Sequence, residues 1–301
     1  MYSEDPRRLD SRDKPENDGI CNEEQWEVQR AFNIEAFLAN ALAEDIGDGD
    51  VTSNATIPAD AVARFAMNAR AELVVCGVSF LPALFALIDP AVVVEILAEE
   101  GQKVASGATL ARLSGPARAL LAGERTALNL VQQLSGVATL TRQYVDVVEG
   151  TNARVVDTRK TIPGLRFLQK YAVTCGGGHN HRMGLYDAVL IKDNHIAVAG
   201  GVAAAVNAAK PSGLPIEVEV DTLDQLDEAL AAKADIILLD NMDNAILREA
   251  VKRTAGRATL EASGNVSLET IRAIAETGVD IISVGKLTHS AVAVDIGLDA
   301  L

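Results

Sequence analysis

Two patterns of hydrophobic and polar positions follow each other along this chain, and the change falls near residue 150. Beyond it, short runs rich in valine, isoleucine and leucine recur at a spacing of roughly 20–30 residues. These runs predict strands over 153–156, 188–192, 216–220, 236–239, 259–262 and 281–284. Amphipathic stretches between them predict helices over 197–209, 223–232, 245–254 and 267–277. The alternation predicts parallel strands, and a (β/α) barrel is favoured because no dinucleotide-binding glycine turn is present.

The first half of the chain has a less regular pattern. It predicts extended runs at 62–71 and 72–78, a helix at 79–88 and hairpin strands at 92–99 and 108–113. An apolar stripe then predicts a long helix over 118–148, with a break near Gly136. Order is expected to begin with a helix over 26–43, because the polar, aperiodic residues 1–30 predict a mobile extension.

Composition restricts the class of protein. The chain has 301 residues, 49% of them hydrophobic, which is sufficient for a globular protein of one large domain or two ordinary domains. A net charge of −15 and 4% aromatic residues argue against binding to nucleic acid or to anionic membranes. Three cysteines without paired spacing indicate a reducing compartment. No apolar run has membrane-spanning length or forms a signal core, so a cytoplasmic location is predicted.

Residues 157–195 form a cationic segment in this acidic chain. Like charges about 6 Å apart repel by roughly 3 kcal/mol per pair at an effective dielectric of about 20. An anion with several carboxylates or phosphates is therefore the expected occupant. The cations that follow predicted strand ends are expected to be functional, and these are Arg159, Lys160, Arg182 and Lys192. Arg166 and Lys170 are expected on solvated helix faces instead.

Each predicted strand of the second half ends in polar or small residues, and the carboxyl ends of barrel strands form the active face of that fold. Alternation puts Glu217 and Glu219 on one inward face, where Lys192 or a metal is expected to pair with them. The alternative for such residues is helix N-capping. We favour capping for Asp221 but not for Asp240.

Two turns could bind a phosphate monoester. Ser263-Gly264-Asn265 and Gly285 would present backbone N–H groups close to helix N-termini, late in the barrel. Two metal sites are not expected. The acidic string 44–50 predicts a turn with helix-capping aspartates rather than a calcium loop. A zinc site would use the candidate ligands Cys175, His179, His181 and His195. Their spacing is unlike that of a structural zinc site.

Six segments of the chain resemble the quinolinate phosphoribosyltransferase family. They are EDIGDGDVTS (44–53), GERTALNLVQQLSGVAT (123–139), DTRKTIPGLR (157–166), GGGHNHRMGLYDAVLIKDNH (176–195), LLDN (238–241) and EASGN (261–265). The resemblance implies an N-terminal α/β sandwich domain over 31–136 and an incomplete (β/α) barrel over 137–289. It also allows the tail 290–301 to pack on the first domain.

The same resemblance implies an activity. Enzymes of that family transfer the phosphoribosyl group of 5-phosphoribosyl-1-pyrophosphate to quinolinate with Mg²⁺. The products are nicotinate mononucleotide, pyrophosphate and CO₂, a step of de novo NAD biosynthesis. A pentosyltransferase of this kind is expected to be a homodimer, or a larger homo-oligomer, in which Arg125 completes the site of the partner subunit.

The family's motifs assign roles to matching positions. The carboxylates of quinolinate are expected to meet Arg125, Arg159, His181 and Arg182. Lys160 and Lys192 match contacts to the sugar pyrophosphate, while Glu219 and Asp240 match groups that meet ribose hydroxyls or Mg²⁺, mostly through substrate or water. The expected catalytic residues are Lys160, Lys192, Glu219 and Asp240. The remaining expected substrate contacts, which include the 5-phosphate loops, are Thr158, Ser263, Gly264, Asn265, Val284, Gly285 and Lys286.

Three other functions stay open. One is a sister phosphoribosyltransferase of the same fold that acts on another small acid. Another is a barrel aldolase in which Lys192 forms a Schiff base. The third is a metabolite sensor without catalysis.

Overall fold

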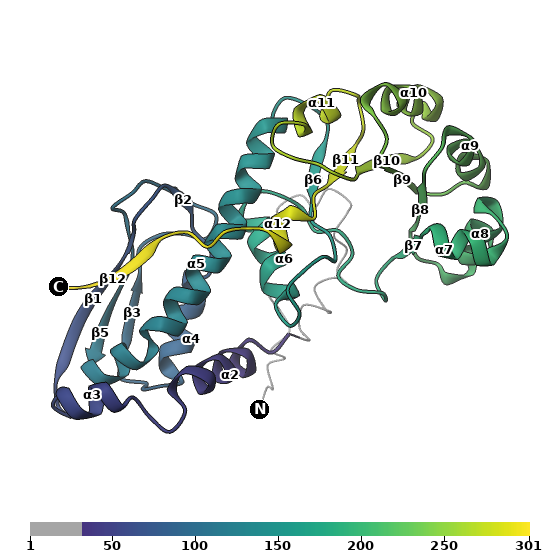
Figure 1. Cartoon of the computed structure of the whole chain (residues 1–301). Coiled ribbons are helices and arrows are strands. Elements are labelled where there is room, and N and C mark those ends of the chain that lie inside the picture. The colour runs from purple at the N-terminus through teal and green to yellow at the C-terminus, as the bar shows by residue number, and fades with distance from the viewer. Residues whose placement is uncertain (1–31) are drawn as a thin grey trace, which may run out of the picture. The chain divides into compact units, whose positions relative to one another are not determined.

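The structure is a computed structural model that describes residues 32–301 (Figure 1). The mobile extension predicted for 1–30, and the first part of the helix predicted over 26–43, lie outside the described residues. By its contacts the chain divides into Met1–Ile34 and Glu35–Leu301, and every described strand belongs to the second unit. No described helix combines the length and the apolar character that crossing a bilayer requires.

The first part of Glu35–Leu301 is built on an antiparallel sheet of order β12-β1-β5-β3. Its strands are β1 (Val62–Ala69), β3 (Val93–Ile96), β5 (Thr109–Pro116) and the C-terminal β12 (Ile296–Ala300). The predicted hairpin is present as the β3–β5 pair. Between them the chain leaves to form β4 (Lys103–Val104), which pairs with β2 (Leu73–Val74). The associated helices are α2 (Ile34–Ile46), α3 (Val51–Thr56), η1 (Val78–Phe80) and α4 (Leu81–Ala86).

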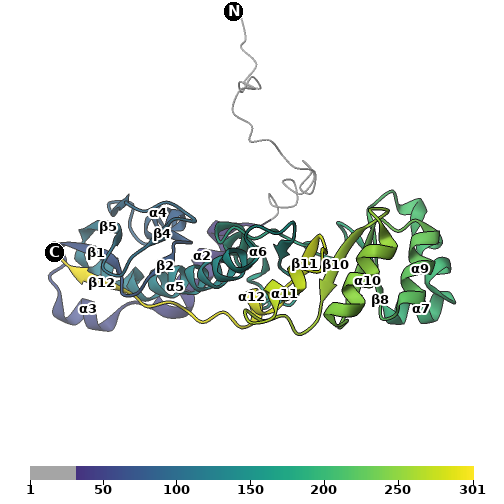
Figure 2. The same ribbon diagram turned by 90° about the horizontal axis from the view of Figure 1, so that it is seen from above.

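A long helix, α5 (Ala117–Val148), packs on this sheet and continues into the second half of the chain. The predicted break near Gly136 is wrong, because α5 is continuous over 32 residues. Gly136 serves a close approach instead, since a Cβ there would lie 2.2 Å from the carbonyl oxygen of Val292. Val292 belongs to the segment that precedes β12. Figures 1 and 2 show that segment running back along α5 to β12. Gln132 Nε2 fixes it by donating to Ile296 O over 2.7 Å.

The second half contains six parallel strands in the order β6-β11-β10-β9-β8-β7. They are β6 (Arg154–Val156), β7 (Val189–Ile191), β8 (Ile216–Val220), β9 (Ile236–Asp240), β10 (Thr259–Ser263) and β11 (Ile281–Ser283). The sheet does not close, because β6 and β7 remain its two edges. It is an incomplete barrel next to an N-terminal sheet domain, so the predicted fold class is confirmed.

Helices cover the outer face of this curved sheet (Figure 1). They are α7 (Asp193–Ala199), α8 (Val202–Ala209), η2 (Lys210–Ser212), α9 (Leu223–Ala232), α10 (Asn244–Thr254) and α11 (Ile271–Ala275). Helices α6 (Arg166–Cys175) and α12 (Lys286–His289) pack against α5 and against each other. The helix predicted over 197–209 is divided into α7 and α8, because Gly200 adopts a φ of +88°. The short helices α3 and α12 were not predicted, since one or two turns carry too little periodicity.

Capping residues agree with the predictions in part. Asp50 caps α3 by accepting hydrogen bonds from the N–H groups of Thr52 and Ser53, as the acidic string suggested. Capping by Asp221 is wrong, because Thr222 is the N-cap of α9. Asp243 caps α10, which leaves Asp240 available, as predicted.

Replacement of Gly136 by alanine tests the role of the close approach. Alanine favours a helix over glycine by about 0.5–1 kcal/mol, but overpacking against a fixed backbone costs about 1–3 kcal/mol. We expect Gly136→Ala to lower the free energy of unfolding by about 1–2 kcal/mol in urea denaturation. Gln133→Ala, on the same helix, is the control and should stay within about 0.5 kcal/mol. A stabilised Gly136→Ala protein would contradict this explanation.

Candidate active site at the carboxyl edge of the barrel

Strand register brings the predicted polar residues to one face of the sheet. Ile191 is paired with Val218, so Lys192 and Glu219, one residue further along each strand, share the opposite face. Lys192 Nζ lies 2.5 Å from Glu219 Oε2. Helices α8 and α9 pack on β8, where Val218 is fully buried. The predicted inward direction of Glu219, and its pairing with Lys192, are therefore confirmed.

Glu217 points to the same face but has a different partner. The imidazole Nε2 of His181 lies 3.0 Å from a carboxylate oxygen of Glu217 and 3.5 Å from one of Glu261. Burial alone would lower the pKa of His181, yet these two carboxylates raise it to about 10. The two carboxylates favour the charged imidazole, whereas the hydrogen bond that His181 Nδ1 accepts from Arg182 N (2.7 Å) favours the neutral ring. Glu217 belongs to His181, and not to Lys192 as the sequence suggested.

Two arginines lie beside this histidine with unused hydrogen-bonding capacity. The Nε atoms of Arg159 and Arg182 are both buried and have no hydrogen-bond partner among the described residues. Burial, and then the charge of Arg159, lower the pKa of Arg182. Buried donors without acceptors are unfavourable, as are like charges close together. An anion between the two guanidinium groups would accept hydrogen bonds from the buried donors and would reduce the repulsion between the two positive charges.

A buried ion pair supports the segment that carries His181 and Arg182. Lys170 and Asp157 are fully buried and paired with each other. Lys170 Nζ also donates to His181 O (2.7 Å), and His181 N donates to Asp157 Oδ1 (2.9 Å). The Asn180 amide donates to the second oxygen of Asp157 over 2.6 Å. Both charges thus determine the course of the chain through 180–182.

This pairing corrects the expectation that Lys170 and Arg166 lie on solvated helix faces. Helix α6 packs against α5, so the face with Lys170 is covered. Arg166 is half-buried, and its guanidinium donates to Thr161 Oγ1 (3.1 Å) and Met183 O (3.0 Å). Both cations hold neighbouring segments in place and are not free for a ligand.

The turn after β10 has the conformation that a phosphate loop needs. Gly264 has a φ of +99°, and a Cβ there would lie 2.1 Å from Asn241 Oδ1. Asn241, with a φ of 53°, donates through Nδ2 to Asp240 (2.6 Å) and accepts from Asn265 Nδ2 (3.2 Å). The sequence analysis assigned no role to Asn241, which it included only in the segment LLDN (238–241). It links Asp240 to the turn of Ser263, Gly264 and Asn265.

The second turn brings Lys160 to Gly285. A Cβ on Gly285 would lie 3.1 Å from Lys160 Cδ, and Thr288 Oγ1 donates to Lys160 O over 2.7 Å. Thr158 Oγ1 accepts from Lys160 N at 3.1 Å. Val284 is buried and joins β11 to β6, while Lys286 is exposed at the start of α12.

One predicted site residue is not joined to the others. Arg125, on α5, is exposed and makes no hydrogen bond or ion pair within residues 32–301. The zinc ligands considered above do not assemble either. In the described part of the chain, the groups of three that could hold a metal are Cys76, Glu100 and Cys175, and His181, Glu217 and Glu261.

An incomplete barrel with cations and carboxylates at the carboxyl edge of its strands defines a domain that binds a multiply charged anion. Comparison with known families specifies it further. The model of the quinolinate phosphoribosyl transferase N-terminal domain matches residues 50–135, and that of the C-terminal domain matches residues 137–299. The chain belongs to the quinolinate phosphoribosyltransferase family.

Individual relatives agree with this assignment. The chain is 47% identical to the nicotinate-nucleotide pyrophosphorylase (carboxylating) of Mycobacterium leprae, over 87% of this chain and 95% of that one. The nicotinate-nucleotide pyrophosphorylase structure from Ehrlichia chaffeensis is 42% identical and superposes with a TM-score of 0.86, covering 90% of this chain and 100% of that one. The corresponding Francisella tularensis structure is also 42% identical, with a TM-score of 0.85 and coverages of 89% and 96%.

The charged state of His181 can be measured through stability. In the folded protein its pKa is about 10, above the ordinary 6.5. The stabilisation is complete below about pH 6.5 and is lost as pH rises through 10. Between about pH 7.5 and 9.5 this group should lower the free energy of unfolding by about 1.4 kcal/mol per pH unit. Urea unfolding of the parent should show that additional slope relative to His181→Gln, and parallel pH profiles would contradict the assignment.

Proposed function

We propose that this chain transfers a phosphoribosyl group from 5-phosphoribosyl-1-pyrophosphate to quinolinate, with loss of CO₂, to form nicotinate mononucleotide. The observation that carries the proposal is the pair of buried, unpartnered Nε atoms of Arg159 and Arg182, close to His181. Relatives named as nicotinate-nucleotide pyrophosphorylases support it. We also propose a cytoplasmic location, on the cysteine usage alone.

A pyridine dicarboxylate suits this arrangement of charge. Each carboxylate can accept two parallel N–H bonds from a guanidinium group, and a charge-assisted bond contributes about 1.5–3 kcal/mol. Arg159 and Arg182 would bind the two carboxylates, with His181 beside them. Their fixed positions would direct the ring nitrogen to the sugar. A neutral or singly charged acid would leave one buried donor unsatisfied.

We propose a homodimer in which Arg125 reaches the site of the partner subunit. Arg125 is exposed and unpartnered within its own described chain, although it lies on a helix that otherwise packs well. An exposed arginine without an intramolecular acceptor is available to an anion on another subunit.

The sugar pyrophosphate would lie across the strand ends. Its 5-phosphate suits the backbone N–H groups of the turn at Gly264 and of Gly285. Lys160, beside Gly285, and Lys192, beside Glu219, would meet the pyrophosphate. Lys192 would then exchange its ion pair with Glu219 for the more highly charged ligand.

The donor set also fits Mg²⁺. Glu219 and Asp240 point to the same face of neighbouring strands, since Glu219 pairs in register with Leu238, two residues before Asp240. Carboxylate oxygens are hard ligands, which Mg²⁺ prefers, commonly through water and substrate phosphates. These two residues would hold it there, and when bound it would neutralise charge on the pyrophosphate.

The residues then act through position and electrostatics rather than through proton transfer. Lys160 and Lys192 stabilise the departing pyrophosphate as the bond to the sugar C1 breaks. The ring nitrogen, held by the arginines, donates its electron pair to C1 and the ring becomes cationic. The bond from the adjacent carbon to its carboxylate then breaks, its electrons neutralise the ring, and that carbon takes a proton from solvent as CO₂ leaves.

Release of CO₂ tests the proposed function directly. We expect quinolinate labelled in the carboxylate next to the ring nitrogen to lose its label only when the sugar pyrophosphate and Mg²⁺ are both present. The nucleotide and labelled CO₂ should form in equal amounts. Turnover of another acid without CO₂ would indicate the sister phosphoribosyltransferase instead, and turnover without Mg²⁺ together with borohydride trapping at Lys192 would indicate the aldolase.

Arg159→Ala should reduce kcat/KM for quinolinate by at least about 100-fold, because two charge-assisted bonds are lost. The KM for the sugar pyrophosphate should change little. Arg159→Lys should recover only part of the loss, because an ammonium group cannot form two parallel bonds. Arg248→Ala, on the exposed side of α10, is the control and should match the parent. Near-normal turnover by Arg159→Ala would refute the carboxylate clamp.

A further inference from the structure

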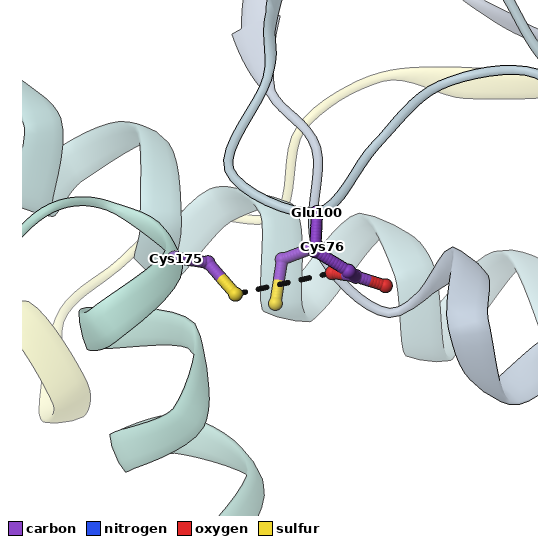
Figure 3. Close-up of side chains that lie close together, drawn as sticks. All are labelled: Cys76, Glu100 and Cys175. Carbon is purple, nitrogen blue, oxygen red and sulfur yellow. Dashed lines mark hydrogen bonds between the residues drawn. The ribbon is translucent and has the colours of Figure 1, made fainter. Parts of the chain in front are cut away.

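A second cluster of acidic groups lies away from the strand ends. Cys76 follows β2, Glu100 lies between β3 and β4, and Cys175 is the last residue of α6. Their two Sγ atoms and a carboxylate oxygen all lie within 4.8 Å of one another. Figure 3 shows the two sulfur atoms side by side, with the carboxylate next to Cys76. The reaction described above uses none of the three.

The carboxylate of Glu100 is held in a fixed orientation. It accepts hydrogen bonds from Gly77 N at 2.8 Å and from Ser79 N at 2.9 Å. The oxygen that faces Gly77 lies 3.9 Å from the sulfur of Cys175. Carboxylates that bind metals are typically oriented by such additional hydrogen bonds.

The charge of this cluster favours a cation. The carboxylate of Glu100 faces two thiols, and no lysine, arginine or histidine within residues 32–301 bonds to any of the three groups. Burial, then Cys175 and Glu100, raise the pKa of the Cys76 thiol. A free thiolate is therefore unfavourable at Cys76, whereas the hydrogen bond with Cys76 lowers the pKa of the Cys175 thiol. A divalent cation would make the thiolate forms favourable, because it stabilises both thiolates and the carboxylate together.

We propose that Cys76, Glu100 and Cys175 bind one thiophilic divalent cation of the Zn²⁺ type, with water as the fourth ligand. Two thiolates and a carboxylate are a suitable set for Zn²⁺. Tetrahedral Zn²⁺, with bonds of about 2.0–2.3 Å, separates its ligand atoms by roughly 3.3–3.8 Å. Ligand atoms that are now up to 4.8 Å apart would therefore move closer together by about 1.5 Å at most. Binding converts two thiols to thiolates and releases two protons, which leaves a site with a net charge of −1.

The site borders a surface hollow through Glu100, and its occupation would have a structural consequence. A surface hollow of about 350 Å³, lined in part by Ser79 and Glu100, lies beside the cluster. The cation would connect two loops of the N-terminal domain to the end of α6. That helix carries Lys170, whose Nζ binds His181 O. Binding should therefore stabilise the folded protein.

The experiment uses the full chain with Cys21→Ser, so that Cys76 and Cys175 are the remaining thiols. The reduced protein, stripped of metal, is titrated with Zn²⁺ in competition with a chromophoric chelator and, separately, with Co²⁺. We expect one equivalent of Zn²⁺ to bind and to raise the thermal unfolding midpoint. Co²⁺ should give near-ultraviolet thiolate charge-transfer absorption, which metal bound at His181, Glu217 and Glu261 cannot produce.

Two variants on the same background make the test specific. Cys175→Ser, at a partly exposed position, should weaken Zn²⁺ binding by at least about tenfold and abolish most of the charge-transfer absorption. Glu100→Gln keeps an acceptor for the backbone N–H groups and should weaken Zn²⁺ while retaining the thiolate absorption. In both variants the increase in thermal midpoint with Zn²⁺ should be smaller than in the Cys21→Ser parent, which is the matched control.

Three outcomes would overturn the proposal. The first is the lack of stoichiometric Zn²⁺ binding and of cobalt–thiolate absorption in the reduced parent. The second is Zn²⁺ affinity that Cys175→Ser leaves unchanged. The third is a Cys76–Cys175 disulfide, seen by mass as the loss of two hydrogens, that re-forms with a mild disulfide oxidant even when Zn²⁺ is in excess.

Discussion

The buried ion pair of Lys170 and Asp157 is the interaction on which the cationic site depends. Both side chains are fully buried, so removing either one would leave an uncompensated charge, at a cost of about 3–5 kcal/mol. Both also bond to the backbone of His181, one to its carbonyl oxygen and the other to its N–H. The segment that carries His181 and Arg182 has little regular structure. Its position therefore comes from this pair together with the backbone bridge between His179 and Val156 of β6.

Charge alternates outward from that pair. Lys170 is paired with Asp157, and His181 Nε2 lies next to Glu217 and Glu261. Among the arginines and lysines of residues 32–301, Arg159 and Arg182 are the two with a buried Nε that has no acceptor. This order explains how a chain with a net charge of −15 presents a positive site. The interior carboxylates outnumber the interior cations, so the positive character of the site comes from the two arginines, whose unused donors are directed to the ligand.

Local patterns predicted the barrel, because strand alternation and strand-to-helix order are properties of short segments. The same rule placed Glu219 beside Lys192 correctly. Prediction from local patterns failed where the neighbours of a residue come from distant parts of the chain. Gly136 was interpreted as a helix break, although its role depends on Val292. Lys170 was assigned to solvent, because a lysine within a helix gives no sign of a buried partner.

Helix α6 connects features that the strands alone do not. Gln169, fully buried, accepts from Ile162 N and donates to Thr288 O, so it joins the loop after β6 to α12 beside Gly285. The next residue, Lys170, fixes His181, and the helix ends at Cys175 in the proposed metal cluster. A shift of α6 along its axis would move the carboxylate clamp and the phosphate turn together. Binding of the dicarboxylate and of the sugar phosphate is therefore expected to be coupled through this helix, since both ligands bias the position of one rigid element.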